Sequence, residues 1–123
     1  MPPDLLVSIK DLENSTRQND SMTVLACIDY GGRDEIIRAV NKAVERGVVV
    51  REKEFSQLLD TYAIPDPDLI IRTSGERRTS GFMIWQSVYS EWAFPQVYFP
   101  DFSLDMFVNT LREFSKRERR FGR

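Results

Sequence analysis

Residues 68–81 have the sequence DLIIRTSGERRTSG, in which a short apolar run passes directly into a polar segment. The apolar run is unbroken, which is typical of a strand whose two faces are both buried. Pro65 and Pro67 precede it and favour an extended entry into the strand. We therefore predict a buried strand over 68–72, followed by an irregular polar segment over 73–81.

A second apolar run, MTVLACI at 22–28, ends at Asp29 and predicts another buried strand. The aromatic-rich region 82–102 predicts a short helix and then short extended pieces, because Pro95 and Pro100 divide it. Apolar residues at helical spacing predict the remaining helices, over 4–16, 33–46, 54–61 and from 104 into the basic C-terminal turns. Ser103 is the predicted N-cap of the last helix.

Each predicted helix has an apolar face that we expect to point inward. These faces consist of Leu5, Leu6, Ile9 and Leu12; of Ile36, Ile37, Val40, Ala43 and Val44; of Phe55, Leu58 and Leu59; and of Leu104, Phe107, Val108, Leu111 and Phe114.

The alternation of helices and buried strands predicts an α/β fold with a parallel sheet, in a single domain of 123 residues. Parallel sheets need helices on both faces, and two or three strands make a small sheet. Either the pattern hides further strands or part of the fold lies elsewhere.

Composition excludes several classes of function. Histidine is absent, which rules out an imidazole base and a histidine-bound zinc. Cys27 is the single cysteine, so no intrachain disulfide can form. No apolar run approaches membrane-spanning length and the chain starts without an export signal, so we expect a cytoplasmic protein. The net charge of −2 argues against a nucleic-acid partner.

The basic residues are unevenly placed. Residues 1–68 carry eight basic and thirteen acidic side chains, whereas residues 69–123 carry nine and six. The segment 72–81 alone holds three arginines, four hydroxyl side chains and two glycines. Guanidinium groups, hydroxyls and open backbone amides are the donors that a phosphate or diphosphate needs. Ligands of parallel sheets bind at the carboxyl ends of strands, so we expect this segment and the loop at 29–33 to form a site, although a solvated polar turn is an equally good interpretation.

Glu91 is a lone carboxylate among aromatic residues. Such a group normally has a cationic partner. We expect an ion pair with Arg72 or Arg78 in preference to a metal ion.

Taken together, the motifs resemble the cis-prenyltransferases, the family typified by undecaprenyl diphosphate synthase. The similarity is carried by DLIIRTSGERRTSGFMIWQSVYSEWAF at 68–94, by PDF at 100–102, by RERRFGR at 117–123 and by IDYGGRDEI at 28–36. It runs in one register from about residue 2 to the end of the chain. Three positions depart from the family pattern, namely Asp29, Thr79 and Gly81, where asparagine, an apolar residue, and asparagine or aspartate are usual.

The resemblance implies a fold, a reaction and a set of site residues. The fold is the C-terminal portion of a parallel-sheet cis-prenyltransferase domain. The reaction condenses isopentenyl diphosphate with an allylic diphosphate in the presence of magnesium, making a polyprenyl diphosphate. Isopentenyl diphosphate would be held by Arg72, Arg78 and Ser80, and the magnesium ion would lie near Glu91. Arg120 and Gly122 would reach across a homodimer to the partner's diphosphate, and the lipid product implies peripheral membrane association.

The first half of the family's domain has no counterpart in this sequence, which lacks the metal-binding Asp-Gly-Asn-Gly-Arg segment. A condensation needs both diphosphates held in attack geometry. We therefore expect the chain to be inactive alone, either as a fragment or as a subunit completed by another polypeptide. A non-catalytic dimerisation or diphosphate-binding module is the alternative.

Overall fold

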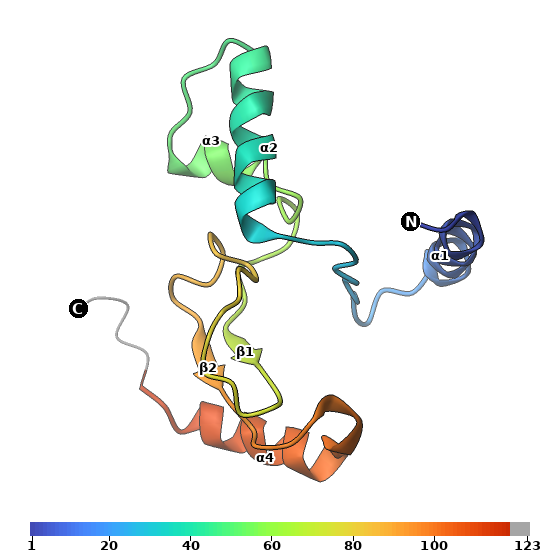
Figure 1. Ribbon diagram of the computed structural model, residues 1–123, viewed down its shortest axis with the longest axis vertical. Helices are drawn as coiled ribbons and strands as arrows, with labels where there is room; N and C mark the ends of the chain where they lie inside the picture. The colour runs from blue at the N-terminus through green and yellow to red at the C-terminus, as the bar shows by residue number, and fades with distance from the viewer. Residues whose placement is uncertain (119–123) are drawn as a thin grey trace.

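The computed structural model describes residues 1–118 and has an α/β architecture, as predicted (Figure 1). It contains three lobes: helix α1 on an extended arm, the pair α2 and α3, and a small sheet with α4 along one side. The elements are α1 (Pro3–Thr16), α2 (Gly32–Glu45), α3 (Glu52–Ser56), β1 (Leu69–Ile71), β2 (Glu91–Ala93), the 3-10 turn η1 (Phe99–Asp101) and α4 (Leu104–Ser115).

The two strands are parallel, and Leu69, Ile70 and Ile71 pair with Glu91, Trp92 and Ala93, respectively. This confirms the strand predicted at 68–72. The second strand forms in the aromatic region, where extended pieces were expected. The short helix predicted after residue 82 is wrong, because residues 82–89 form turns. Positive φ at Met83 is one local reason, since L-residues in a right-handed helix cannot adopt it.

The strand predicted at 22–28 is also wrong. These residues have no strand structure, and Met22 and Val24 are 77% and 79% exposed. A strand exists only when its backbone groups pair with a neighbour. Within residues 1–118, β1 and β2 pair with each other and neither pairs with this segment. Figure 1 shows it as an extended connection between α1 and α2.

The packed core lies between α2 and α3. Its buried residues are Ala39, Ala43, Phe55, Leu58 and Leu59. Trp85 covers them, with its ring centroid 4.6 Å from that of Phe55 and its indole N–H donating to Ser56 Oγ at 3.1 Å. The predicted inward side chains at 55, 58 and 59 are confirmed, although α3 ends at Ser56, before the predicted boundary.

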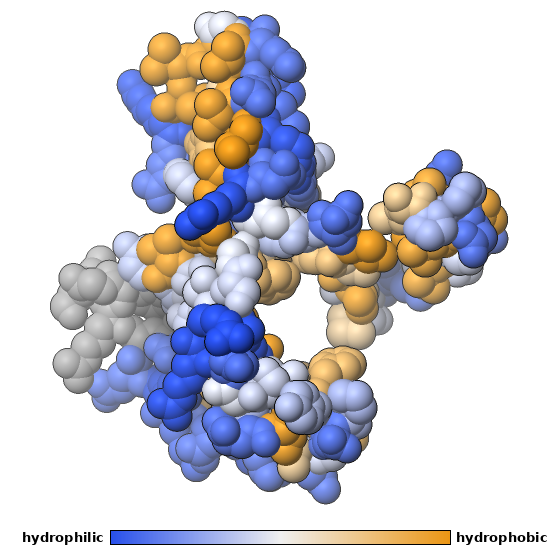
Figure 2. Space-filling view, viewed as in Figure 1, coloured by the Kyte–Doolittle hydropathy of each residue, from blue (hydrophilic) through white to orange (hydrophobic). Residues whose placement is uncertain are grey.

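The other predicted apolar faces are largely uncovered. Helix α2 buries Gly32, Glu35, Ala39 and Ala43, while Ile37, Val40 and Val44 are exposed. Helix α1 buries no residue, and α4 also buries none, although Ser103 caps it as predicted by accepting from Met106 N at 3.3 Å. Hydrophobic residues therefore reach the surface over several elements (Figure 2). Across the described residues, no helix is both long enough and apolar enough to span a lipid bilayer.

Candidate functional site

The loops at 29–33 and 73–81 come together beside the carboxyl end of β1. They border a hollow of about 380 Å³, lined by Tyr30, Ile70, Ile71, Arg72, Thr73, Thr79, Ser80, Phe82 and Trp92. We call it the β1 hollow. It combines one cation and three aliphatic hydroxyl side chains with aromatic walls, so it can accept a ligand that has an anionic and an apolar part.

Arg72 is fixed at the edge of this hollow. Its backbone N–H donates to Ala93 O at 2.9 Å, which extends the pairing of β1 with β2 by one residue. Its guanidinium Nη1 donates to Ser80 Oγ at 2.8 Å and to the carbonyl oxygen of Arg78. Two of the predicted site residues, Arg72 and Ser80, are therefore in direct contact.

The third predicted phosphate ligand, Arg78, contributes its backbone to this contact but not its side chain. The Arg78 guanidinium forms an ion pair with Glu76 on the exposed side of the loop. The β1 hollow thus has Arg72 as its one lining cation among the described residues.

The backbone of this loop adopts conformations that L-residues rarely take. Ser74 and Ser80 have φ values of 77° and 48°, and Gly75 and Gly81 have 71° and 81°. Such a conformation costs a non-glycine residue about 1 kcal/mol and persists where surrounding contacts hold it. Here Ser74 N donates to Val97 O at 2.6 Å and Gly75 N to Pro95 O at 2.9 Å. The loop is therefore anchored to the segment that follows β2.

Gly32 joins the two loops. Its N–H donates to Gly81 O at 2.9 Å, and a Cβ at this position would lie 2.5 Å from the same oxygen. The sequence marks the pair Gly31-Gly32 only as a turn. Its role as a point of close backbone approach is visible only when residues 32 and 81 are seen together.

Glu35 is a further site feature that the sequence does not reveal. It lies in the first turn of α2, where carboxylates are usually exposed, but it is 1% exposed. It accepts from Tyr30 Oη at 2.5 Å and from Asp60 N at 3.0 Å. It also accepts from Gln86 Nε2, at 3.2 and 3.0 Å. Burial, together with the hydrogen bond to Glu35, raises the pKa of Tyr30 well above the usual range of a phenol.

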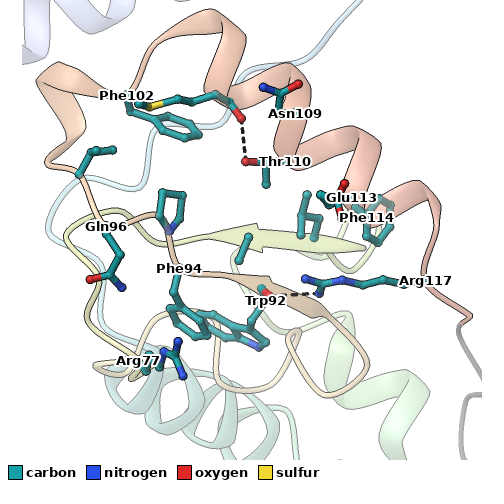
Figure 3. Close-up of a pocket in the computed structure, with 15 residues that line it drawn as sticks. Arg77, Trp92, Phe94, Gln96, Phe102, Asn109, Thr110, Glu113, Phe114 and Arg117 are labelled. Atoms are coloured by element: carbon teal, nitrogen blue, oxygen red, sulfur yellow. Dashed lines mark hydrogen bonds between the residues drawn. The ribbon is translucent and has the colours of Figure 1, made fainter.

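Glu91 has the cationic partner that the sequence predicts, but the predicted identity is wrong. Its carboxylate pairs with Arg117 at 2.8 Å. The same Arg117 nitrogen donates to Trp92 O at 3.1 Å, a contact that Figure 3 shows. The parallel register explains the error. Glu91 pairs with Leu69 at the start of β1, whereas Arg72 follows the other end of the strand.

Arg117 also borders a groove of about 600 Å³ between β2 and α4, which Figure 3 shows. Its floor includes the stacked rings of Trp92 and Phe94, whose centroids are 5.7 Å apart. Arg77 lies by these rings and does not line the β1 hollow.

The described residues do not form a metal site on their own. Within 1–118, no three Asp, Glu, Cys or His side chains gather where they could hold an ion. Magnesium is commonly held by one or two protein carboxylates together with substrate phosphates. Glu91 fits that arrangement as a single carboxylate, provided that it exchanges Arg117 for the ion. The predicted residues Arg120 and Gly122 lie outside the described part of the chain.

The chain is similar to known prenyltransferases along its whole length. Residues 1–122 match the prenyltransferase family model described as undecaprenyl diphosphate synthase. The isoprenyl transferase of Aquifex pyrophilus is 42% identical over 98% of this chain and 52% of its own length, and that of Thermotoga maritima is 44% identical over 99% and 54%. The chain thus spans about half the length of the curated relatives it matches.

Two crystal structures show the same fold at 34% identity, each covering all of this chain. One is a probable undecaprenyl diphosphate synthase from Campylobacter jejuni, with a TM-score of 0.87 over 58% of that protein. The other is lavandulyl diphosphate synthase from Lavandula x intermedia in complex with dimethylallyl diphosphate, with a TM-score of 0.92 over 56%. The chain belongs to the undecaprenyl diphosphate synthase family of prenyltransferases.

Proposed function

We propose that this chain supplies the isopentenyl diphosphate side of a cis-prenyltransferase. The complete reaction forms a carbon–carbon bond between isopentenyl diphosphate and the allylic group, whose carbon–oxygen bond to diphosphate breaks. It leaves a cis double bond and releases diphosphate and a proton. The observation that carries the proposal is the contact between Arg72 and Ser80 at the mouth of the β1 hollow. It offers a fixed cation and hydroxyl donors beside an apolar wall, which suits an isoprenoid diphosphate.

The chain's own residues would act through position and charge. Arg72 is already held by Ser80 and by the Arg78 carbonyl, so it would meet the substrate with little reorganisation. The hydroxyls of Thr73, Thr79 and Ser80 would donate to the remaining phosphate oxygens. The Arg78 side chain would join them by leaving Glu76, an exposed pair of the kind that contributes little to stability.

We place magnesium at Glu91. When bound, the ion would stabilise charge on the departing diphosphate. For that, Arg117 has to leave the Glu91 carboxylate, with which it forms an ion pair. Arg120 and Gly122 are assigned to the partner's diphosphate across a homodimer. We place the protein in the cytoplasm, with peripheral membrane association through its lipid product.

We further propose that this chain is inactive alone and that the site is completed by a segment equivalent to the other half of the relatives' length. Uncovered apolar residues support this idea, since they occur in residues 22–28 and on α2. A non-catalytic module that dimerises or binds diphosphate is the second candidate. It is favoured by α4, whose Leu104, Phe107 and Leu111 are exposed along one helix.

The proposal is tested by calorimetric titration of the purified chain with isopentenyl diphosphate. Arg72→Gln removes the fixed cation and should weaken binding about tenfold or more, since a hydrogen bond to a charged group contributes about 1.5–3 kcal/mol. Arg77→Gln is the matched control, because it removes the same charge from the same loop outside the hollow. Equal affinities of the wild type and Arg72→Gln would contradict the proposal, and so would an absence of binding to the wild type.

A condensation assay separates the two candidate functions. Turnover that appears only when the complementary half is added would support a split enzyme. Tight diphosphate binding without turnover in either condition would favour the non-catalytic module.

A further inference from the structure

The buried Glu35 carboxylate is held by neutral donors. Its contacts are the Tyr30 hydroxyl, the Asp60 backbone N–H and the Gln86 amide, which come from three separate segments of the chain. The nearby cations of α2, Arg38 and Lys42, form their ion pairs with the Asp60 carboxylate at the surface. Burying a carboxylate is costly unless hydrogen bonds compensate it. Each of these three donors therefore matters to the position of Glu35.

Gln86 is the central donor of this cluster. It is 2% exposed, and its Nε2 contacts both oxygens of Glu35 and also Thr61 Oγ1 at 2.9 Å. The orientation of the amide follows from its chemistry, because only the N–H end can face a carboxylate. Among the described residues, the Gln86 carbonyl oxygen is a buried atom with no hydrogen-bond partner. An apolar residue would avoid that cost, so the amide is present for its N–H groups.

Tyr30 connects this cluster to the β1 hollow. Its hydroxyl is committed to Glu35, and its ring lines the hollow. The ring also packs edge-on against Phe82, with centroids 5.8 Å apart. Phe82 and Gln86 belong to the same turn-rich segment. Glu35 and Gln86 thus hold together, from behind, the two segments whose aromatic rings form a wall of the hollow.

We propose that Gln86 is a positioning residue for the diphosphate site: through Glu35 it fixes the Tyr30 wall of the β1 hollow. This inference rests on the proposed function, because the hollow is taken as the isopentenyl diphosphate site. Gln86 itself does not line the hollow, so it acts only through Glu35 and Tyr30. The buried hydrogen bonds between Gln86 and Glu35 therefore act beside the backbone hydrogen bond from Gly32 N to Gly81 O, which joins the two loops.

The test compares two substitutions that remove buried polar contacts at similar sites. Gln86→Met keeps the length of the side chain but removes both N–H donors. Thr61→Val keeps the shape of residue 61 and removes a contact of Gln86 that does not involve Glu35 or Tyr30. Isopentenyl diphosphate affinity is measured by calorimetry, and urea unfolding is measured in parallel, so that binding refers to folded molecules.

We expect Gln86→Met to weaken isopentenyl diphosphate binding about tenfold, because a Tyr30 wall that is no longer fixed through Glu35 has to be ordered when the ligand binds. Thr61→Val should lower stability and leave the affinity within about twofold. If both variants weaken binding equally, or if Gln86→Met leaves it unchanged, the inference is overturned. Loss of affinity in Arg72→Gln together with no change in Gln86→Met would overturn this inference alone and leave the proposed function standing.

A spectroscopic measurement tests the connection from Gln86 through Glu35 to Tyr30 in the absence of ligand. It is made at alkaline pH values at which circular dichroism shows that the protein is still folded. The chain has four tyrosines, and the wild type should form one phenolate fewer because Tyr30 is withheld. Gln86→Met should restore the missing phenolate, whereas Thr61→Val should not. The double variant Glu35→Gln, Gln86→Glu exchanges the carboxylate and the amide between the two positions. It should recover part of the isopentenyl diphosphate affinity that Gln86→Met loses. An unchanged phenolate count in Gln86→Met, or an exchange variant no better than Gln86→Met, would overturn the inference.

Discussion

Two apolar runs of this chain are similar in composition, but only one of them forms a strand. Residues 69–71 form β1, pair with β2 and bury Ile70, which is 8% exposed. Residues 22–28 form no strand and leave Val24 at 79% exposure. Both runs have the side chains that strands prefer, so the difference lies in the availability of a partner. A strand is a property of a pair of segments, and a parallel strand especially so, because its partner comes from elsewhere in the chain.

The largest effect that this comparison predicts is on folding stability. Ile70→Ala should lower the free energy of unfolding by about 2–4 kcal/mol, because it leaves a cavity beside the sheet. Val24→Ala should change it by less than about 0.5 kcal/mol, since Val24 is already in solvent. Urea denaturation followed by tryptophan fluorescence measures both. Equal losses would mean that residues 22–28 are packed in solution.

A second prediction concerns Gly32, whose N–H donates to Gly81 O in the loop after β1. Gly32→Ala places a methyl group 2.5 Å from Gly81 O, a backbone atom that cannot move freely. The better helix propensity of alanine offsets this only in part, and we expect a loss of about 1–3 kcal/mol.

Gly31→Ala is the matched control for Gly32→Ala. A Cβ there has its nearest neighbour at 3.9 Å, and the φ of −139° suits any residue. It should cost less than about 1 kcal/mol. Thermal unfolding distinguishes the two variants, and similar melting temperatures would contradict the close approach of residues 32 and 81.

The smallest effect is expected at the start of β2, where Glu91 pairs with Arg117. Both side chains are partly exposed, so Arg117→Gln should cost at most about 1 kcal/mol, and the cost should shrink in high salt. Lys116→Gln removes the neighbouring charge, which pairs with Glu113 on the exposed side of α4, and should cost less. Denaturant midpoints at low and high salt test this. A loss from Arg117→Gln that salt does not reduce would mean that the pair is more buried than the structure shows.

Much of the fold follows from local sequence. The strand at 68–72, the helices around 4–16 and 33–46 and the Ser103 cap are all encoded by side-chain spacing and by capping residues a few positions apart. Contact between Arg72 and Ser80 could also be anticipated, since both lie in one short loop after a buried strand. The turns at 82–89 could not, because this segment is held by side-chain contacts of Trp85 and Gln86 with residues that are 25 to 51 positions away in the chain.

The wrong predictions of buried segments and buried helix faces share one cause. A stripe of apolar residues shows that a face prefers to be covered, but not that a partner is present. On α2 the apolar stripe at Ile37, Val40 and Val44 is exposed, while Glu35 on the neighbouring face is buried. Nothing about an acidic residue in a first helical turn marks it as buried. Its side-chain donors, Tyr30 and Gln86, are 5 and 51 residues away in the chain.

The amino-acid sequence was sufficient for the α/β class, for the polar loop that follows the strand at 68–72 and for kinship with the cis-prenyltransferases. These depend on local patterns and on motifs in a fixed order. Tertiary structure decided which segments pair, which cation neutralises Glu91 and how Gln86 is connected to the wall of the β1 hollow. These depend on distances between residues far apart in the chain, and only folding brings such residues within reach of a hydrogen bond.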